Sequence, residues 1–397
     1  MDIIFGILNI IPGVILGVII LTFLVAIHEF GHGIVARRNG VKVEEFGIGF
    51  PPKARSIKIA NSVLGKDVEY SLNWLPLGGF VRLKGEHDSA DGKGTYGSAT
   101  FWQKTKILLA GVTVNWLAAV ALFTILAWVG LPKLTAVLPN QFTVPSDTSV
   151  VSKPVQVDVV VPGLPADQAG LKAGDKIISL NGQQIDSADS LTAAVKQNAG
   201  KSVTLVYSRD SKERQTTANI RADNSDNQGF IGAGLSQQQL IRATWSAPVV
   251  GFMTTVQLTG ATLQGLGGTV QKAATGLFGQ LSFDSQVRSG ASKDLQEAGN
   301  NVAGPLGIFG IIFPAAEKAG ATQMVLLTAV LSLTLAVMNV LPIPGLDGGR
   351  WYLTAIFKAL KKPLTEEIEA KVNGIGMLVL IGLVVLVTIA DIGKLAG

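Results

Sequence analysis

Four long apolar stretches constrain the fold of this chain more than any other feature. They are residues 3–27, 107–131, 321–345 and 373–390, and all are poor in charged side chains. Each is close to the roughly 20 residues that a helix needs to cross a bilayer. One such stretch alone is compatible with a buried helix of a soluble domain. Four in one chain predict a polytopic α-helical membrane protein with four transmembrane helices.

Composition supports this class and excludes several others. Hydrophobic residues make up 48% of the chain and charged residues 15%, a balance that is typical of membrane proteins. The chain has no cysteine, so disulfide scaffolds, iron–sulfur clusters and cysteine nucleophiles are excluded. Any metal ion must therefore be bound by His, Asp or Glu. The net charge of +5 is not gathered into one basic domain, and we expect no nucleic-acid partner.

The distribution of Lys and Arg predicts the orientation in the membrane. The short connections 28–106 and 346–372 are denser in Lys and Arg than the long segment 132–320, and positive charge in short loops marks the cytoplasmic side. Residues 37–106 and 350–372 should therefore be cytoplasmic, with the long segment and both termini extracytoplasmic. The first apolar stretch lacks the basic start of a signal peptide, so we expect the mature protein to keep it.

This topology divides the chain into segments of different character. In the Gly- and Ala-rich second part of the outer segment, helices that lie on the membrane surface or beneath the outer domain are favoured over re-entrant loops. The expected segments are a first transmembrane helix with a metal motif (1–36), a cytoplasmic loop with a membrane-associated β-hairpin (37–106), a second transmembrane helix (107–131), a folded extracytoplasmic domain (132–236), an extracytoplasmic amphipathic or interfacial segment (237–320), a third transmembrane helix with a Leu-Asp-Gly-Gly motif (321–349), and a cytoplasmic loop with the fourth transmembrane helix (350–397).

A metal-binding pattern lies at the end of the first apolar stretch. His28-Glu29-Phe30-Gly31-His32 has the H-E-x-x-H spacing, in which two histidines one helical turn apart can bind one Zn²⁺ ion and the glutamate can act on a metal-bound water. Two of the three histidines of the chain fall in this window. Because ionisable groups beside an apolar span are costly and usually functional, we predict that His28 and His32 bind Zn²⁺ and that Glu29 is the general base.

A catalytic zinc site takes three protein ligands, so a third must come from elsewhere in the chain. Asp347 follows the third apolar stretch, just after Pro342 and Pro344. Since the first and third stretches cross in the same direction, Asp347 should reach the same membrane face as His32, and a proline break at this depth suits a water-filled cavity. The alternatives are that Asp347 only caps the following helix, or that His87, otherwise a solvated loop residue, is the third ligand.

With HEFGH at 28–32 and NVLPIPGLDGG at 339–349, the chain resembles the site-2 protease family of intramembrane zinc metalloproteases over nearly its whole length. It is most similar to the bacterial branch typified by regulator-of-sigma-E protease. The resemblance implies a bacterial cell-membrane protein with an extracytoplasmic PDZ domain between spans two and three. It also implies Asp347 as third zinc ligand, and cleavage within or next to transmembrane segments of single-span proteins that another protease has already cut, such as anti-sigma factors or signal-peptide remnants.

Two asparagines are further candidates for substrate contacts. Asn115 ends the sequence Ala-Gly-Val-Thr-Val-Asn, which is similar to the family pattern A-G-P-x-x-N with Val112 in place of the proline. Asn115 would hold a substrate carbonyl or stabilise the oxyanion, or else make a helix–helix hydrogen bond. Asn339 would bind substrate backbone or satisfy carbonyls that the prolines leave free.

The cytoplasmic loop predicts a β-hairpin, because residues 46–50 and 68–83 alternate and are rich in strand-forming residues. The resemblance implies that its edge, around Gly79 and Phe80, captures the unwound substrate by strand addition. A merely structural hairpin is the alternative.

Residues 159–182 are similar to the core of protease-associated PDZ domains, and we expect a single PDZ domain. It would bind a peptide ligand beside a sheet edge, or sterically exclude bulky ectodomains. A different class of function is a non-catalytic, zinc-stabilised membrane scaffold that recruits partners through this domain. Glu29 argues against the scaffold, because a structural metal site needs no general base.

Overall fold

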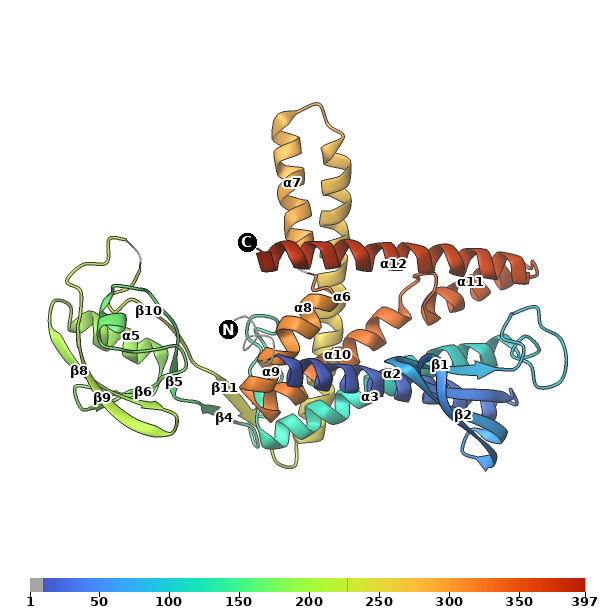
Figure 1. Cartoon of the computed structure of the whole chain (residues 1–397), viewed down its shortest axis with the longest axis horizontal. Coiled ribbons are helices and arrows are strands. Elements are labelled where there is room, and N and C mark those ends of the chain that lie inside the picture. The colour runs from blue at the N-terminus through green and yellow to red at the C-terminus, as the bar shows by residue number, and fades with distance from the viewer. Residues whose placement is uncertain (1–9, 227, 301, 397) are drawn as a thin grey trace. The chain divides into compact units, whose positions relative to one another are not determined.

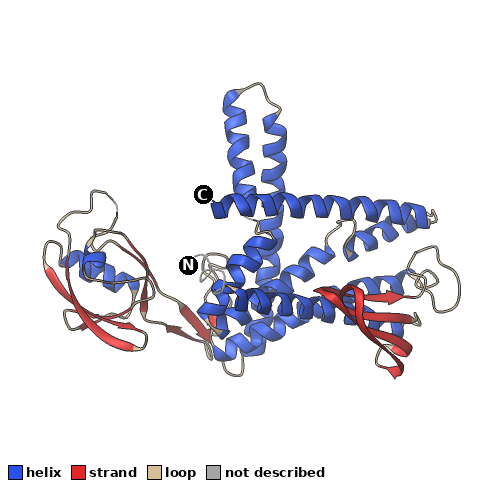
Figure 2. Cartoon of the chain, in the orientation of Figure 1, coloured by secondary structure: helices blue, strands red, loops and turns tan. Residues whose placement is uncertain are grey.

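The computed structural model describes residues 10–226, 228–300 and 302–396; Figure 1 labels its elements and Figure 2 colours them by type. Contacts divide the chain into two compact units. Unit 1 consists of Met1–Leu126, Ala136–Phe142 and Pro248–Gly397, and unit 2 consists of Ala127–Thr135 and Thr143–Ala247.

Over the described residues, four helices are long and apolar enough to cross a membrane. They are α2 (Ile11–Arg38), α3 (Phe101–Val129), α10 (Ala321–Val340) and α12 (Glu366–Ala396). The expected set of four apolar helices is thereby confirmed, although residues 3–9 of the first expected stretch lie outside the described residues. α3 and α12 begin before their apolar stretches, because a helix continues through charged residues wherever its backbone hydrogen bonds are kept.

Small residues let the helices of unit 1 approach closely. A Cβ atom on Gly31 of α2 would lie 3.1 Å from the carbonyl oxygen of Ala110 on α3, and one on Gly17 would lie 2.5 Å from the ring of Phe313. Lipid tails are as apolar as the side chains of the helices, so the hydrophobic effect does not drive helices together within a membrane. Close backbone packing of this kind is a main source of helix association. The approach at Gly31 matters most here, because it holds the metal motif of α2 against α3.

The predicted hairpin consists of β1 (Val43–Ser62) and β2 (Gly65–Leu83). Its register is unusual, since Phe46 lies opposite both Tyr70 and Val81. The two long strands therefore bend into four antiparallel rows, and the row 79–83 pairs with another row on one side only. Large apolar side chains are exposed around the bend: Phe50, Leu72, Trp74, Leu75 and Leu77.

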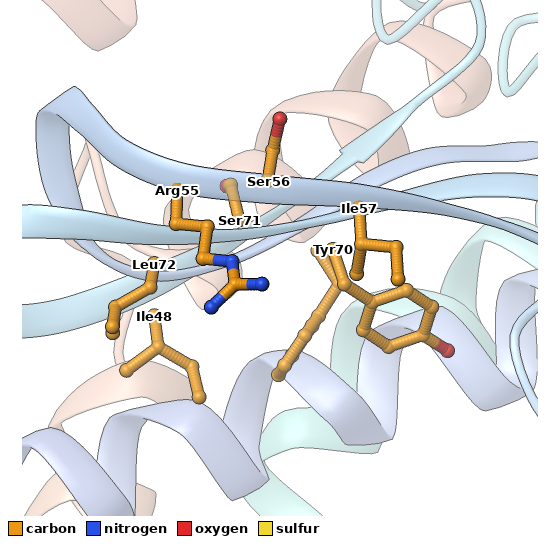
Figure 3. Close-up of a pocket in the computed structure, with 8 residues that line it drawn as sticks. Ile48, Arg55, Ser56, Ile57, Tyr70, Ser71 and Leu72 are labelled. Atoms are coloured by element: carbon orange, nitrogen blue, oxygen red, sulfur yellow. The ribbon is translucent and has the colours of Figure 1, made fainter.

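The hairpin also carries a shallow cavity. Its volume is about 420 Å³, and both strands line it, with Ile48 and Leu72 on one side and Ile57 and Tyr70 on the other (Figure 3). Arg55 is the charged residue among those that line it.

Unit 2 is built on antiparallel sheets. One sheet has the order β10-β5-β6-β8-β9 with β7 beside β6, and a three-stranded sheet has the order β3-β11-β4. The elements are β3 (Leu131–Pro132), β4 (Ser149–Ser152), β5 (Val155–Val160), α4 (Pro165–Gln168), β6 (Lys176–Leu180), β7 (Gln183–Gln184), α5 (Ala188–Gln197), β8 (Ser202–Arg209), β9 (Lys212–Asn219), β10 (Ala233–Ser236) and β11 (Gln239–Arg242).

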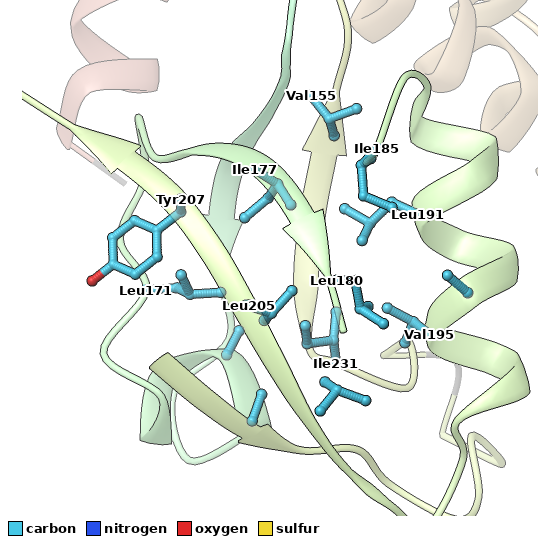
Figure 4. Packing of buried hydrophobic residues seen from close by; sticks show 14 of the residues in the cluster. Val155, Leu171, Ile177, Leu180, Ile185, Leu191, Val195, Leu205, Tyr207 and Ile231 are labelled. Atoms are coloured by element: carbon cyan, nitrogen blue, oxygen red, sulfur yellow. The ribbon is translucent and has the colours of Figure 1, made fainter. Parts of the chain in front are cut away.

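Alternate residues of β8 face the core of unit 2, as the period of a strand requires. Val203, Leu205 and Tyr207 are buried and belong to one apolar cluster with Leu191 and Val195 of α5 (Figure 4). Unit 2 extends past the expected boundary at residue 236, because β11 pairs with β3 and β4.

The expected segment 237–320 thus contains β11 and a series of helices. These are α6 (Ala247–Gln280), α7 (Ser285–Asn300), α8 (Pro305–Gly307), a π-helical turn (Ile308–Ile312) and α9 (Phe313–Ala319). α11 (Asp347–Ala359) follows α10 after a short turn.

Candidate metal centre

The C-terminal half of α2 presents the H-E-x-x-H residues to the inside of unit 1. His28 and His32 are 5% and 6% exposed, and their ring centroids lie 4.7 Å apart. Candidate ligand atoms of His28, Glu29 and His32 all lie within 4.8 Å of one another. The helical spacing therefore produces the cluster that the sequence predicts.

Asp347 reaches this cluster from the turn between α10 and α11. Its Oδ2 atom lies 2.9 Å from His28 Nε2 and 3.1 Å from His32 Nε2. Glycines make the turn possible, because a Cβ on Gly348 or Gly349 would lie 2.3 or 2.1 Å from a carbonyl oxygen of the preceding loop. The structure brings Asp347 to both histidines. Asp347 is the first residue of α11, the N-cap is Leu346, and no side chain makes a capping hydrogen bond to this helix.

Gly111 on α3 keeps space open beside these atoms. A Cβ at this position would lie 2.5 Å from Nε2 of both His28 and His32. Three ligand atoms that each lie about 2.0–2.2 Å from one zinc ion must be within about 4.4 Å of each other, and both separations between Asp347 Oδ2 and a histidine Nε2 meet this condition. Two imidazoles and a carboxylate are also a common donor set for catalytic zinc, so His28, His32 and Asp347 fit the metal.

The ring of His32 has a fixed orientation. Its Nδ1 atom lies 2.7 Å from the carbonyl oxygen of Ile107 on α3. A carbonyl only accepts hydrogen bonds, so Nδ1 carries a proton, and Nε2, on the side of Asp347, is the atom that can bind a metal ion. This is the tautomer that a metal ligand needs.

The ring of His28 is contacted by Asn115, whose side-chain nitrogen lies 3.3 Å from His28 Nδ1. Asn115 is 1% exposed, and its Oδ1 atom is buried without a hydrogen-bond partner. Its backbone oxygen accepts a hydrogen bond from Ser332 Oγ of α10 at 2.8 Å. Asn115 therefore lies behind the histidine, within the packing of the helices.

Glu29 lies between the histidine cluster and the hairpin. Its Oε2 atom accepts a hydrogen bond of 3.1 Å from the backbone N–H of Val81 in β2. Gly79, two residues earlier, packs so tightly that a Cβ would lie 2.8 Å from the Gly47 carbonyl oxygen and 3.7 Å from Ala26 of α2. Phe80 covers Gly47 on the neighbouring row. The edge row of the hairpin is thus in direct contact with the helix that carries the motif.

Two other candidates lie apart from the cluster. Asn339 donates to the carbonyl oxygen of Leu335 in its own helix at 3.0 Å. The Nε2 atom of His87 lies 3.2 Å from Glu366, so Asp347 rather than His87 joins the histidine pair. Sequence reasoning assigned no role to Gly111, although the Ala-Gly pair before Asn115 was a usable signal.

Similarity to known proteins extends over nearly the whole chain. The profile of Peptidase family M50 matches residues 16–383. This chain belongs to peptidase family M50. A protein of Clostridium perfringens is 30% identical over 370 residues, which cover 93% of this chain and 95% of that protein. Membership confirms the predicted class, a zinc metalloprotease of the site-2 type.

Two named relatives agree with this class. Regulator of sigma-W protease RasP of Bacillus subtilis is 28% identical, and the match covers 95% of this chain and 97% of that protein. Zinc metalloprotease RasP of Geobacillus kaustophilus is 25% identical with the same coverage, 95% and 97%. A solved PDZ domain from an SdrC-like protein of Listeria monocytogenes matches 21% of this chain and 86% of its own length, at 25% identity and a TM-score of 0.19.

Proposed function

We propose that this M50 peptidase is an intramembrane zinc metalloprotease that cleaves within or next to the transmembrane segments of single-span proteins already shortened by another protease. Anti-sigma factors and signal-peptide remnants are substrates of this kind. The observation that carries the proposal is the convergence of His28, His32 and Asp347, with Glu29 alongside, on a helix apolar enough to lie in a bilayer.

In this proposal His28 Nε2, His32 Nε2 and a carboxylate oxygen of Asp347 hold the metal. When bound, zinc supplies Lewis acidity, which makes a water molecule nucleophilic near neutral pH and polarises a carbonyl. Glu29 takes the proton of that water and delivers it to the departing amine, as a general base and then a general acid. The Val81 N–H holds the Glu29 carboxylate beside the histidines.

Asn115 acts as a positioning residue for His28 rather than as an oxyanion donor. It is almost fully buried behind the ring, where a substrate carbonyl has no access. If the amide is turned so that Oδ1 faces His28 Nδ1, the oxygen gains the partner that it lacks. The imidazole proton then sits on Nδ1, and Nε2 is free to bind the metal, as in His32.

The substrate binds as an added strand at the edge row 79–83 of the hairpin. This row pairs on one side only, and Val81 joins it to Glu29, so an extended peptide there would run past the metal centre. Gly79 and Phe80 shape this edge. The exposed apolar residues at the bend favour insertion of the hairpin into the lipid bilayer.

Unit 2 serves as an extracytoplasmic PDZ domain, with both termini on the same side and residues 37–106 and 350–372 in the cytoplasm. The Lys and Arg distribution supports this sidedness. The domain binds an extended peptide or excludes bulky ectodomains. α6 exposes apolar residues at a regular spacing, Val249, Val256, Leu263, Val270 and Leu277, which supports an interfacial position for segment 237–320.

The test compares wild type with Glu29→Gln in detergent, with cleavage of a tagged single-span substrate and bound zinc measured on the same samples. Cleavage should fall by about 10²–10⁴-fold, the usual contribution of a general base, while zinc stays at the wild-type level. Glu367→Gln, an exposed glutamate in the first turn of α12, is the matched control and should cleave normally. If wild type binds zinc but cuts none of a panel of single-span substrates, the scaffold function gains support instead.

A further inference from the structure

A basic pocket lies at one end of the apolar helices α3 and α12. It is formed by the first turn of α3, the C-terminal turn of α11 and the connection that leads into α12, and its volume is about 290 Å³. Three lysines line it: Lys104 on α3, Lys358 in the last turn of α11, and Lys362 in the connection that follows α11. Asp88 is the carboxylate among the residues that line it.

The pocket keeps an excess of positive charge. Lys104 is 5% exposed, and its Nζ atom lies 2.7 Å from Asp88 Oδ1, so these two charges compensate each other. Lys358 lies over the ring of Phe101 at 4.0 Å from the centroid. Within the described part of the chain, neither Lys358 nor Lys362 forms an ion pair with a carboxylate. Both ammonium groups remain available to an anion.

The backbone at the end of α11 holds the two lysines at one cavity. Lys361 has φ +53°, in the left-handed region where helices usually place a glycine. Lys362 N–H donates to the carbonyl oxygen of Phe357 at 3.1 Å, and Lys361 N–H donates to that of Lys358 at 3.0 Å. This Schellman turn reverses the chain, so that residues four apart both line the pocket.

The residues around the pocket are of the kinds found where lipid headgroups meet water. Trp102 and Tyr352, next to the pocket in sequence, are 68% and 40% exposed, and such residues favour the membrane–water interface. The lining of the pocket also includes apolar side chains, those of Phe101, Phe357 and Leu364. A ligand with an anionic head and a hydrocarbon body would satisfy both parts.

We propose that this pocket binds the phosphate of an anionic phospholipid, with Lys358 and Lys362 at the phosphate and the acyl chains along α3. Basic pockets between transmembrane helices are a known means of binding anionic headgroups. The site adjoins the metal centre through the backbone. α11 begins at Asp347, and Ile107, one turn after Lys104, accepts the hydrogen bond from His32. A lipid bound between α3 and α11 would therefore stabilise the positions of both helices beside the histidines.

The test uses the full chain in detergent, titrated with phosphatidylglycerol or phosphatidylcholine, with bound lipid counted by native mass spectrometry. Wild type should bind phosphatidylglycerol more tightly. A lysine near an anionic membrane surface contributes a factor of about five in affinity, so Lys358→Gln with Lys362→Gln should weaken the binding about thirtyfold. Lys196→Gln with Lys201→Gln removes the same charge from exposed positions of unit 2 and should leave the binding unchanged.

A third pair of substitutions and a competition with phosphate make the lipid site falsifiable. Lys358→Arg with Lys362→Arg should keep the preference for phosphatidylglycerol, which guards against misfolding of the glutamine variant. Equal loss in both glutamine pairs means general charge attraction and overturns the proposal, as does equal wild-type affinity for the two lipids. Inorganic phosphate that displaces the lipid at low concentration would show that free phosphate is the ligand. Lysines that serve only the dipole of α11 would lower stability without any change in lipid preference.

Discussion

Asp347 in unit 1 and Asp175 in unit 2 are both shielded from solvent, but different groups contact their carboxylates. Asp175 accepts hydrogen bonds from Arg209 Nε at 2.6 Å and Nη2 at 2.7 Å, and from the Lys172 N–H at 2.8 Å. Burial would raise the pKa of Asp175, but Arg209 and the Lys172 N–H outweigh burial and lower the pKa below its usual value. The protein itself supplies the cation that this buried charge needs.

Asp347 faces two imidazoles instead, at 2.9 and 3.1 Å. A neutral imidazole brings no charge, but it is a good metal ligand. In the proposed site, a divalent cation bound by the histidines would give Asp347 the positive partner that Arg209 gives Asp175. The Asp347 side chain is 23% exposed. A largely buried carboxylate beside two imidazoles is a candidate metal ligand, whereas one beside a guanidinium forms a structural ion pair.

Replacing each of the two carboxylates by an amide should give the largest difference in zinc binding and cleavage. Asp347→Asn should abolish cleavage and weaken zinc binding by more than the 10–100-fold that is typical for the loss of an outer-shell partner, because it removes a direct ligand. Asp175→Asn should leave zinc content and cleavage unchanged. Zinc by elemental analysis and cleavage of the single-span substrate measure both. A wild-type zinc content in Asp347→Asn would contradict the distinction between the two carboxylates.

Removing the guanidinium should affect unit 2 alone. Arg209→Ala leaves the Asp175 charge buried and unpaired, which costs about 3–5 kcal/mol for fully buried pairs. We expect about 3 kcal/mol, the lower end of that range, because the Arg209 side chain is 20% exposed. Hydrogen exchange of peptides from β6 and β8 measures the loss within the full chain. Lys201→Ala, an exposed lysine just before β8, is the control, and a loss of zinc in Arg209→Ala would contradict the separation of the two sites.

Filling the space beside the histidines should act on the metal centre alone. Gly111→Ala places a methyl group 2.5 Å from both Nε2 atoms, and overpacking of this kind usually costs about 1–3 kcal/mol. Zinc affinity, measured by competition with a chelator, should fall by the corresponding factor of about 5–150. Gly260→Ala on α6 is the matched control, because a Cβ there meets no atom within 4 Å. Tight zinc binding by Gly111→Ala would show that the ligand atoms do not occupy this space.

The sequence predicts the parts of the centre that depend on local spacing. The helical period places His28 and His32 on one face of α2, and the order of the apolar stretches brings Asp347 to the same end. Gly111 and Ile107 depend on how α3 docks against α2, and that docking has no local pattern. Their roles therefore emerge only from the folded chain.

Two features of the fold were beyond sequence reasoning for similar reasons. β1 pairs with two rows of β2 at once, because bulges shift its register, and alternation of residues does not reveal a bulge. α6 continues through Gly260, Gly265, Gly267 and Gly268, although each glycine lowers helix stability by about 1 kcal/mol relative to alanine. Tertiary packing against α3 and α7 outweighs this intrinsic preference.

A weaker effect is expected at the outer partner of His28. Asn115→Leu removes the contact with Nδ1 and should weaken zinc binding about tenfold, the lower end for such partners, because the contact is long at 3.3 Å. Asn115→Asp tells the two amide orientations apart. An aspartate only accepts hydrogen bonds, so it should keep zinc binding near the wild-type level if Oδ1 is the group that faces the ring. Asn339→Leu, whose amide bonds within its own helix, should leave zinc affinity unchanged. If Asp and Leu at position 115 weaken zinc binding equally, Asn115 does not set the tautomer of His28, and Asp347 together with His32 must orient that ring.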